Sequence, residues 1–308
     1  MKILKLISAV LMVGLSFTAC RKIEEPSYAV VSEAKTMIDV AYGTDPKQKM
    51  DVYLPANRNS NTNVVIFVHG GSFIGGDKSE FNNQAKYLAS RGYAVLNVNY
   101  RLVEGDGIFN APPLHKESAI KIADQVNDLQ KVVDFAVLNA KSWVMSSSRM
   151  GMAGHSAGAT LALLYSYDLR NNNRIQVVAN IAGALDFVFT DIPNWEFLPP
   201  YAFEAAYRYT GKDVNVTNLD DYKLISPLYN VVENRRVPTI NIFPENNDVM
   251  GLPKMNLGTY QRFTVKLNEV KVPNEFVFMA GSDHGFSKSG DWISVLGQTV
   301  TYFNKHIK

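Results

Sequence analysis

The sequence predicts an α/β fold in which helices cover both faces of a mostly parallel central sheet. Continuous apolar runs such as NVVIFVHGG and YAVLNVNY are typical of strands that are buried on both faces. Segments with the apolar spacing of amphipathic helices separate these runs. Because strands alternate with helices along the chain, we expect right-handed βαβ units.

The expected elements follow one another along most of the chain. The first strand is KMDVYLP, Lys49 to Pro55, where apolar residues alternate and a proline ends the run. Further strands are expected in NVVIFVHGG, YAVLNVNY, MGMAG, IQVVANIAG, VPTINIF and EFVFMAG. Helices are expected over residues 79–92, 117–140, 159–167, 257–267 and 291–305.

One segment, residues 186–236, interrupts this alternation. It contains no clear strand, but aromatic residues are frequent between Phe187 and Tyr209. We expect a partly helical insertion, called the cap below. Ligands of open α/β sheets bind beyond the carboxyl ends of the strands. The cap, His69-Gly70-Gly71 and Gly154 to Gly158 all follow expected strand ends, so we expect them to meet at this edge.

Composition excludes several classes of function. The chain has 308 residues, 46% of them hydrophobic and 19% charged, which fits one or two globular domains with a substantial core. No basic run supports nucleic-acid binding. The single cysteine and five scattered histidines lack the spacing of metal ligands. We therefore expect no metal and no cofactor.

The first twenty residues, MKILKLISAVLMVGLSFTAC, indicate export. A short basic start, an apolar stretch and small residues are typical of a signal peptide, here residues 1–19. Ala19-Cys20 resembles the lipobox of bacterial lipoproteins, which implies a lipid on Cys20 and a membrane-anchored exported protein. Residues 20–36 would be a polar tether, and residues 37–308 the folded domain. The alternative is a soluble secreted protein in which the cysteine is incidental.

The stretch GMAGHSAGAT contains the candidate nucleophile. Ser156 lies between Gly154 and Gly158, directly after an expected strand and before an expected helix. A sharp strand-to-helix turn needs residues without a Cβ at these positions, and it exposes the central serine. A serine hydroxyl is a weak nucleophile, so it needs a base, an orienting group and donors for an oxyanion.

His284 is the expected base. It follows the last strand on a glycine-containing loop, in SDHGF. His155 neighbours the serine and should point away, His69 is expected to brace its own loop, and His306 lies near the end of a helix. His115 could line the pocket, but it precedes the long helix.

The expected acid is Asp248, just beyond the strand VPTINIF. Glu245 is the alternative, and Asp283 is too close to His284 in sequence to orient it. The chain order Ser156, Asp248, His284 is that of the α/β-hydrolase class. Oxyanion donors are expected from the backbone N–H groups of Ala157, Gly71 and Ser72. The alternative for His69-Gly70-Gly71 is an ordinary tight turn.

In combination, the chain resembles α/β-hydrolase-fold esterases. YGTDPKQKMDVYLP, VVIFVHGGSFIGGDKS, YAVLNVNYRL, GMAGHSAGA, ISPLYNV and SDHGF occur in the order of that class. They are most similar to bacterial feruloyl and acetyl carbohydrate esterases and arylformamidases, related to hormone-sensitive-lipase-like esterases. The resemblance implies Ser156 as nucleophile, His284 as base and Asp248 as acid. The chain departs from the pattern at Ser72, where a third glycine is usual, and at Phe243-Pro244, where His-Gly usually precedes the acid.

The expected function is that of a serine carboxylesterase acting through an acyl-enzyme. The aromatic cap favours short or aromatic acyl groups, and the resemblance implies acetyl or feruloyl groups on saccharides. The expected substrate is therefore a small-molecule or oligosaccharide ester. Two alternatives are an amide hydrolase that uses the same triad, and a non-catalytic binding protein of this fold.

Overall fold

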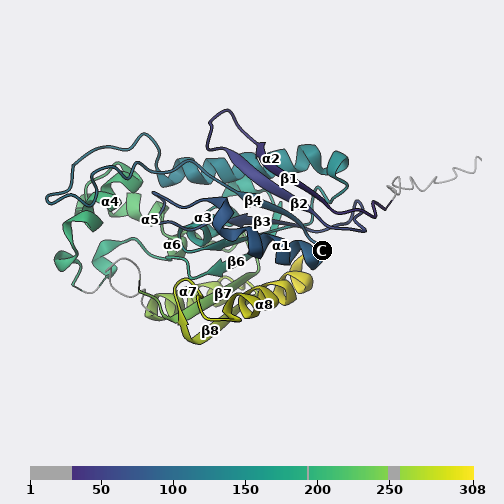
Figure 1. The fold of residues 1–308 in the computed structure, drawn as a ribbon. Coiled ribbons are helices and arrows are strands. Elements are labelled where there is room, and N and C mark those ends of the chain that lie inside the picture. The colour runs from purple at the N-terminus through teal and green to yellow at the C-terminus, as the bar shows by residue number, and fades with distance from the viewer. Residues whose placement is uncertain (1–29, 193, 249–256) are drawn as a thin grey trace, which may run out of the picture.

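The computed structural model describes residues 30–192, 194–248 and 257–308, and an eight-stranded sheet forms its centre (Figure 1). The strand order is β1-β2-β4-β3-β5-β6-β7-β8. β1 and β2 pair in antiparallel fashion, as do β2 and β4, and every later pairing is parallel. The strands are β1 Lys35–Ala41, β2 Lys49–Leu54, β3 Val64–Val68, β4 Ala94–Val98, β5 Met150–His155, β6 Ile175–Ile181, β7 Thr239–Asn246 and β8 Asn274–Asp283. The prediction of a mostly parallel sheet is confirmed.

Helices cover both faces of this sheet. The side chains of β3 alternate between two cores: Val64, Ile66 and Val68 belong to the core that includes the helices Ile122–Trp143 and Ala157–Ser166, whereas Val65 and Phe67 belong to the core that includes the helices Asn82–Ser90 and Asp291–His306. This explains why β3 reads as a continuous apolar run. The helices are α1 Asn82–Ser90, α2 Ile122–Trp143, α3 Ala157–Ser166, α4 Pro200–Thr210, α5 Leu219–Leu224, α6 Pro227–Asn230, α7 Leu257–Glu269 and α8 Asp291–His306.

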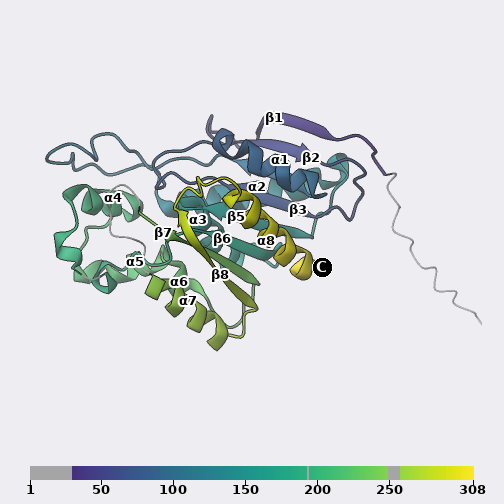
Figure 2. The same ribbon diagram turned by 60° about the horizontal axis from the view of Figure 1, so that its bottom comes forward.

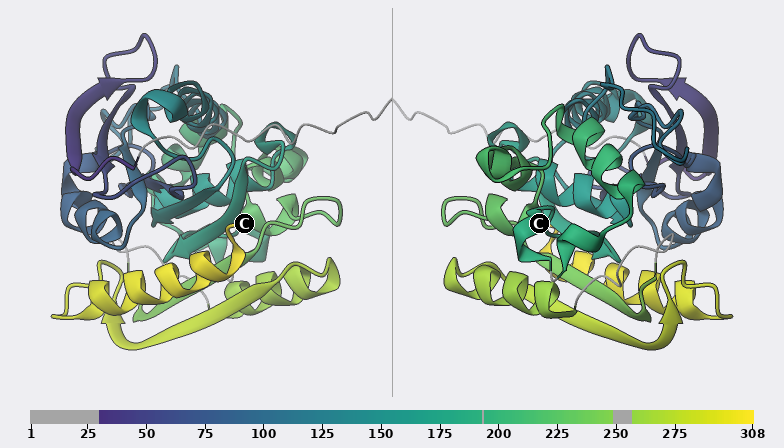
Figure 3. Two further views of the ribbon diagram at one scale, coloured as in Figure 1. Left: turned by 90° about the vertical axis from the view of Figure 1, so that its right-hand side faces the viewer. Right: turned by 90° about the vertical axis from the view of Figure 1, so that its left-hand side faces the viewer.

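The edge strand β1 was not predicted from the sequence. Five of its seven side chains are exposed and the other two are half-buried, so its sequence lacks the apolar run of the central strands. Backbone pairing with β2 holds it at the sheet edge. At the opposite edge, the long strand β8 lies beside α8 (Figure 3), and Gln298 of that helix reaches Met279 of the strand.

The segment between β6 and β7 contains α4, α5, α6 and short 3-10 turns (Figure 2). Arg208 of α4 fastens it to the loop that follows β4. The guanidinium is fully buried and donates to the backbone oxygens of Glu104, Asp106 and Leu114 at 2.6–2.8 Å. Its Nε also pairs with Glu204 at 2.6 Å. A buried charge is tolerated when it is paired and hydrogen-bonded in this way.

The expected signal peptide and Cys20 lie outside the described residues, so lipidation stays a prediction. Among the helices that the structure describes, none is long and apolar enough to cross a membrane.

Candidate active site

Ser156 stands at the apex of a strained turn between β5 and α3. Its φ of 53° and ψ of −124° lie in a region that residues with a Cβ rarely adopt. The turn is so tight that it requires glycine on both sides of the serine. A Cβ at Gly154 would lie 2.3 Å from the oxygen of Gly158, and a Cβ at Gly158 would lie 2.2 Å from the oxygen of Val68. The Ser156 N–H bonds to the Ile181 oxygen at 2.9 Å, which ties the turn to β6.

His284 meets this serine. Its Nε2 lies 2.8 Å from the Oγ of Ser156, within the range of a nucleophile–base hydrogen bond. The two residues are 128 positions apart in the chain and come together because β5 and β8 end at the same edge of the sheet. Both residues are half-buried, so a small molecule can reach them.

The other nitrogen of His284 contacts Asn247. The Oδ1 of Asn247 is in short hydrogen-bonding contact with Nδ1, and the asparagine is 1% exposed. The expected partner, Asp248, is the next residue, and its side chain is exposed. The contact with Nδ1 that was expected of Asp248 is thus made by Asn247 in the structure.

The weighed alternative, Glu245, lies elsewhere. It is exposed, and its Oε2 accepts the N–H of Gly281 at 2.5 Å, which joins the ends of β7 and β8. Asp283 accepts the N–H of Ser287 at 2.9 Å within its own loop. Asn247 was not predicted from the sequence, because a carboxylate was expected to orient His284.

Burial governs the charge of His284. Burial lowers the pKa of the imidazole most, the nearby His155 lowers it too, and the Asp283 carboxylate opposes them, so that the pKa is about 4. His284 is therefore neutral at pH 7, as a general base must be. A neutral ring with its proton on Nδ1 donates to Asn247 and leaves Nε2 free to accept the serine proton.

His155 supports the histidine loop rather than the nucleophile. Its Nε2 lies 2.8 Å from the backbone oxygen of His284. Burial lowers the pKa of His155 to about 4, so the ring is neutral and its Nε2–H donates this bond. The ring also packs against Phe81, Phe286 and Trp292. The expectation that it points away from the serine fits this arrangement, but its contact with the base was not foreseen.

The loop after β3 lies beside the turn. A Cβ at Gly70 would be 3.0 Å from the Cβ of Ser156, so the backbone of this loop approaches the nucleophile closely. Gly71 and Ser72 both have positive φ, 118° and 51°. Ala157 is the first residue of α3, where a backbone N–H has no acceptor within the helix. Gly71 and Ser72 directly follow Gly70 in this loop and Ala157 directly follows Ser156, and their role as oxyanion donors stays a prediction.

The remaining histidines do not meet the candidate pair. His69 is buried, lies 2.6 Å from the Gly70 oxygen through Nδ1 and stacks on Tyr100, so it braces the loop as expected. His115 contacts Glu204 at 2.9 Å and packs against Tyr207 with the two rings tilted. His306 is on α8 and packs against Tyr302.

Aromatic side chains of the cap form two clusters. Phe187 and Tyr209 pack around Phe73, with ring centroids 5.8 and 5.0 Å from it, and the Tyr209 hydroxyl donates to the Ser72 oxygen at 2.9 Å. The second cluster, Phe189, Trp195, Phe203 and Tyr222, packs within the cap. The first cluster therefore backs the loop beside Ser156, and the second fills the interior of the cap.

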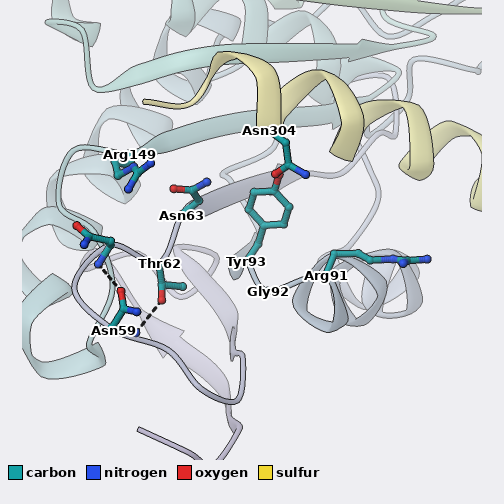
Figure 4. Close-up of a pocket in the computed structure, with 9 residues that line it drawn as sticks. Asn59, Thr62, Asn63, Arg91, Gly92, Tyr93, Arg149 and Asn304 are labelled. Carbon is teal, nitrogen blue, oxygen red and sulfur yellow. Dashed lines mark hydrogen bonds between the residues drawn. The ribbon is translucent and has the colours of Figure 1, made fainter. Parts of the chain in front are cut away.

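A separate polar hollow of about 270 Å³ lies at the other end of the sheet (Figure 4). Asn63, Tyr93 and Arg149, which line it, precede β3, β4 and β5, whereas Ser156 follows β5. It is not part of the candidate active site. Among the described residues, no group of three or more His, Cys, Asp or Glu side chains is placed to hold a metal ion.

Comparison with known proteins assigns the family. The sequence model of the BD-FAE family matches residues 50–250, which include the turn at Ser156 and Asn247. The chain belongs to the BD-FAE family. This confirms the predicted α/β-hydrolase fold and the resemblance to this group of hydrolases at the level of the family.

Two curated relatives of this BD-FAE member are enzymes of related chemistry. It is 29% identical over 136 residues to isoprenylcysteine alpha-carbonyl methylesterase of Arabidopsis thaliana, and 28% identical over 135 residues to kynurenine formamidase of Danio rerio. The matches cover 44% and 43% of this chain. They span only 29% and 39% of the relatives' own lengths.

Solved structures share the fold. A truncated carbohydrate esterase from gut microbiota superimposes with a TM-score of 0.68 at 16% identity, over 88% of this chain and 95% of that one. Esterase B from Lactobacillus rhamnosis superimposes with a TM-score of 0.66 at 20% identity, over 89% and 88%. Both likenesses agree with the α/β-hydrolase architecture of the BD-FAE member.

Proposed function

We propose that this protein is a serine hydrolase that cleaves carboxylic esters, with Ser156 as nucleophile and His284 as general base. The observation that carries the proposal is the 2.8 Å contact between Ser156 Oγ and His284 Nε2 on a strained turn. Such strain costs about 1–3 kcal/mol and persists where function requires it. The family of this chain and the solved esterases of similar fold support the same conclusion.

The proposed reaction has two stages. His284 Nε2 takes the Ser156 proton while Oγ forms a bond to the carbonyl carbon of the ester. The resulting oxyanion lies among the N–H groups of Ala157, Gly71 and Ser72, at the positive end of α3. His284 then returns the proton to the leaving alcohol as the C–O bond breaks. Water, activated by the same histidine, releases the acid from the acyl-enzyme.

The proposed substrates are short or aromatic acyl esters, with acetyl or feruloyl groups on saccharides as the natural class. Phe187 and Tyr209, which are half-buried and pack against buried Phe73, provide aromatic surface behind the loop next to Ser156. Planar acyl groups and sugar rings both stack well on such side chains. A carbohydrate esterase among the structural relatives supports this class.

A fluorophosphonate probe tests the hydrolase assignment. We expect labelling of the wild type and none of Ser156→Ala, with Ser142→Ala, an exposed serine on α2, as the labelled control. An unlabelled wild type would favour a non-catalytic binding protein. A series of p-nitrophenyl esters then tests acyl length: we expect kcat/KM to fall for long chains, and a steady rise beyond about ten carbons would indicate a lipase.

Amide hydrolysis is the second candidate, because one relative is a kynurenine formamidase. The same serine and histidine could attack an aryl formamide. Comparing kcat/KM for an aryl formamide, an aminoacyl anilide and a p-nitrophenyl ester of equal size separates the two functions. A preference for the formamide would replace the ester assignment without changing the nucleophile.

We also propose that Cys20 carries a lipid that anchors the exported protein to a membrane, as the sequence TAC after an apolar segment indicates. One acyl chain binds membranes weakly, so two or more are needed for stable anchoring. Cys20→Ala should move the protein into the soluble fraction. The proposal would be contradicted if the wild-type protein were found in the soluble fraction and mass spectrometry showed no lipid on Cys20.

A further inference from the structure

We propose that Asn247 is the positioning residue of His284, so that this hydrolase works with a neutral Ser-His-Asn arrangement and stays active in more acidic solution than a Ser-His-Asp enzyme would. This inference rests on the proposed function, because it concerns the base of the same reaction. It replaces a carboxylate, the group that the sequence led us to expect, with an amide.

The geometry places the amide where the carboxylate would act. Asn247 Oδ1 contacts His284 Nδ1, and His284 Nε2 contacts Ser156 Oγ, which completes a chain of three side chains. The amide oxygen can only accept, so this contact holds the imidazole proton on Nδ1. The reverse orientation of the amide would place an N–H against Nδ1 and force the proton onto Nε2. His284 could not then accept the serine proton.

Burial makes the amide of Asn247 costly at this position. Asn247 is 1% exposed, and its Nδ2 is buried without a hydrogen-bond partner among the described residues. An unpaired buried N–H group costs about 1–3 kcal/mol. A carboxylate would have no such group, and aspartate has nearly the same shape as asparagine. The amide therefore provides an uncharged group beside the histidine, and the unpaired N–H is the cost of that choice.

Charge explains what the amide changes. The titratable groups that act on His284 are His155 from β5 and Asp283 from β8; Glu245 at the end of β7 instead holds the Gly281 N–H. From α8, uncharged Trp292 contacts the same loop through the Gly285 oxygen. With no carboxylate at Nδ1, burial holds the pKa of His284 at about 4. A carboxylate within hydrogen-bonding distance would favour the imidazolium and raise that pKa by about 1–3.

The consequence follows from the sign of this shift. General-base catalysis requires the neutral ring, which is present above the histidine pKa and lost as pH falls through it. With the amide in place, the neutral ring is therefore lost only at a lower pH. In return, the imidazolium that forms when Ser156 gives up its proton is stabilised only by an amide dipole, so the base is weaker.

The test compares Asn247→Asp with Asp248→Asn. Both variants exchange an amide and a carboxylate at adjacent positions, one buried against His284 and one exposed. The measurement is kcat/KM on a p-nitrophenyl ester from pH 4 to 9, with a thermal melt of each variant to establish folding. The acid limb of this profile reports the pKa of the base in the free enzyme.

We expect the wild type and Asp248→Asn to keep most of their pH 7.5 kcat/KM at pH 5, whereas folded Asn247→Asp loses about tenfold between these values. An acid limb of Asn247→Asp that coincides with that of the wild type would overturn the inference. A shift of the acid limb in Asp248→Asn, and not in Asn247→Asp, would also overturn it. Fluorophosphonate labelling separates the two proposals, because a labelled wild type with an unmoved limb contradicts only the role of Asn247.

Discussion

The turn around Ser156 and the turn that follows β7 contribute to the same site but differ in how tightly the fold constrains them. At the first turn, backbone segments approach so closely that any Cβ at Gly154 or Gly158 would overlap another chain segment. At the second, Glu245 and Asn246 end the strand and Asn247 and Asp248 follow it, and each of the four side chains could accept a hydrogen bond. Steric requirements therefore fix the residue types of the first turn, and only orientation selects a residue in the second.

This difference explains what the sequence could predict. Close approach restricts a position to glycine, so Gly-x-Ser-x-Gly identifies both the turn and its serine. The direction in which each side chain points at the end of β7 is harder to predict, because the pairing of β7 with β8 shifts register between Pro244 and Asn246. Such irregularities break the alternation of side chains that would otherwise say which residue points inward. Asn247 is buried and its neighbours on both sides are exposed, which no pattern in the sequence indicates.

The same reasoning applies to the rest of the fold. The central strands and their helices were predictable because burial on both faces leaves continuous apolar runs. β1 was not, because backbone pairing alone holds it and most of its side chains are exposed. The contacts of Arg208 with the loop after β4 join residues about a hundred positions apart, and no local pattern predicts them.

Removing the serine at the first turn should have the largest effect. Ser156→Ala should lower kcat by about 10⁴-fold or more, His284→Ala should do the same, and the double variant should lose little more, since the two act as a unit. Steady-state rates of all three, with Ser142→Ala as control, measure this. Additive losses in the double variant would show that the two side chains act independently.

Adding one methyl group tests the steric half of the comparison. In Gly158→Ala the new Cβ would lie 2.2 Å from the Val68 oxygen and 2.3 Å from the His69 oxygen. We expect a loss of about 1–3 kcal/mol in the free energy of unfolding or more, together with lower activity. Gly297→Ala on α8 is the matched control, since its nearest neighbour there is the Tyr87 hydroxyl at 3.9 Å. Equal melting temperatures for the two variants would argue against the steric explanation.

Tyr209→Phe should have a smaller effect. It removes the hydroxyl that donates to the Ser72 oxygen but keeps the ring against Phe73 and Phe187. One hydrogen bond contributes about 0.5–1.5 kcal/mol, so we expect kcat/KM to fall about two- to tenfold if the bond holds the oxyanion loop. Tyr201→Phe, in the same cap but against Phe109, is the control. Equal losses in both variants would mean that the cap, and not the loop, is affected.

The smallest effects should come from the two carboxylates of the second turn. Asp248 is exposed, and exchange of an exposed carboxylate for an amide usually changes stability by less than about 0.5 kcal/mol. Asp248→Asn should therefore keep kcat/KM at pH 7.5 within about twofold of the wild type. Glu245→Gln keeps an oxygen that can accept the Gly281 N–H but loses its charge, and charge-assisted bonds are roughly twice as strong as neutral ones. The loss of kcat/KM in Glu245→Gln should be slightly larger because His284 directly follows β8. Steady-state kinetics on one ester ranks the two variants. If Asp248→Asn instead lowered kcat/KM by about 10³-fold, Asp248 would be the orienting group, as the sequence predicts. The key residue of each turn would then be one that the sequence identifies.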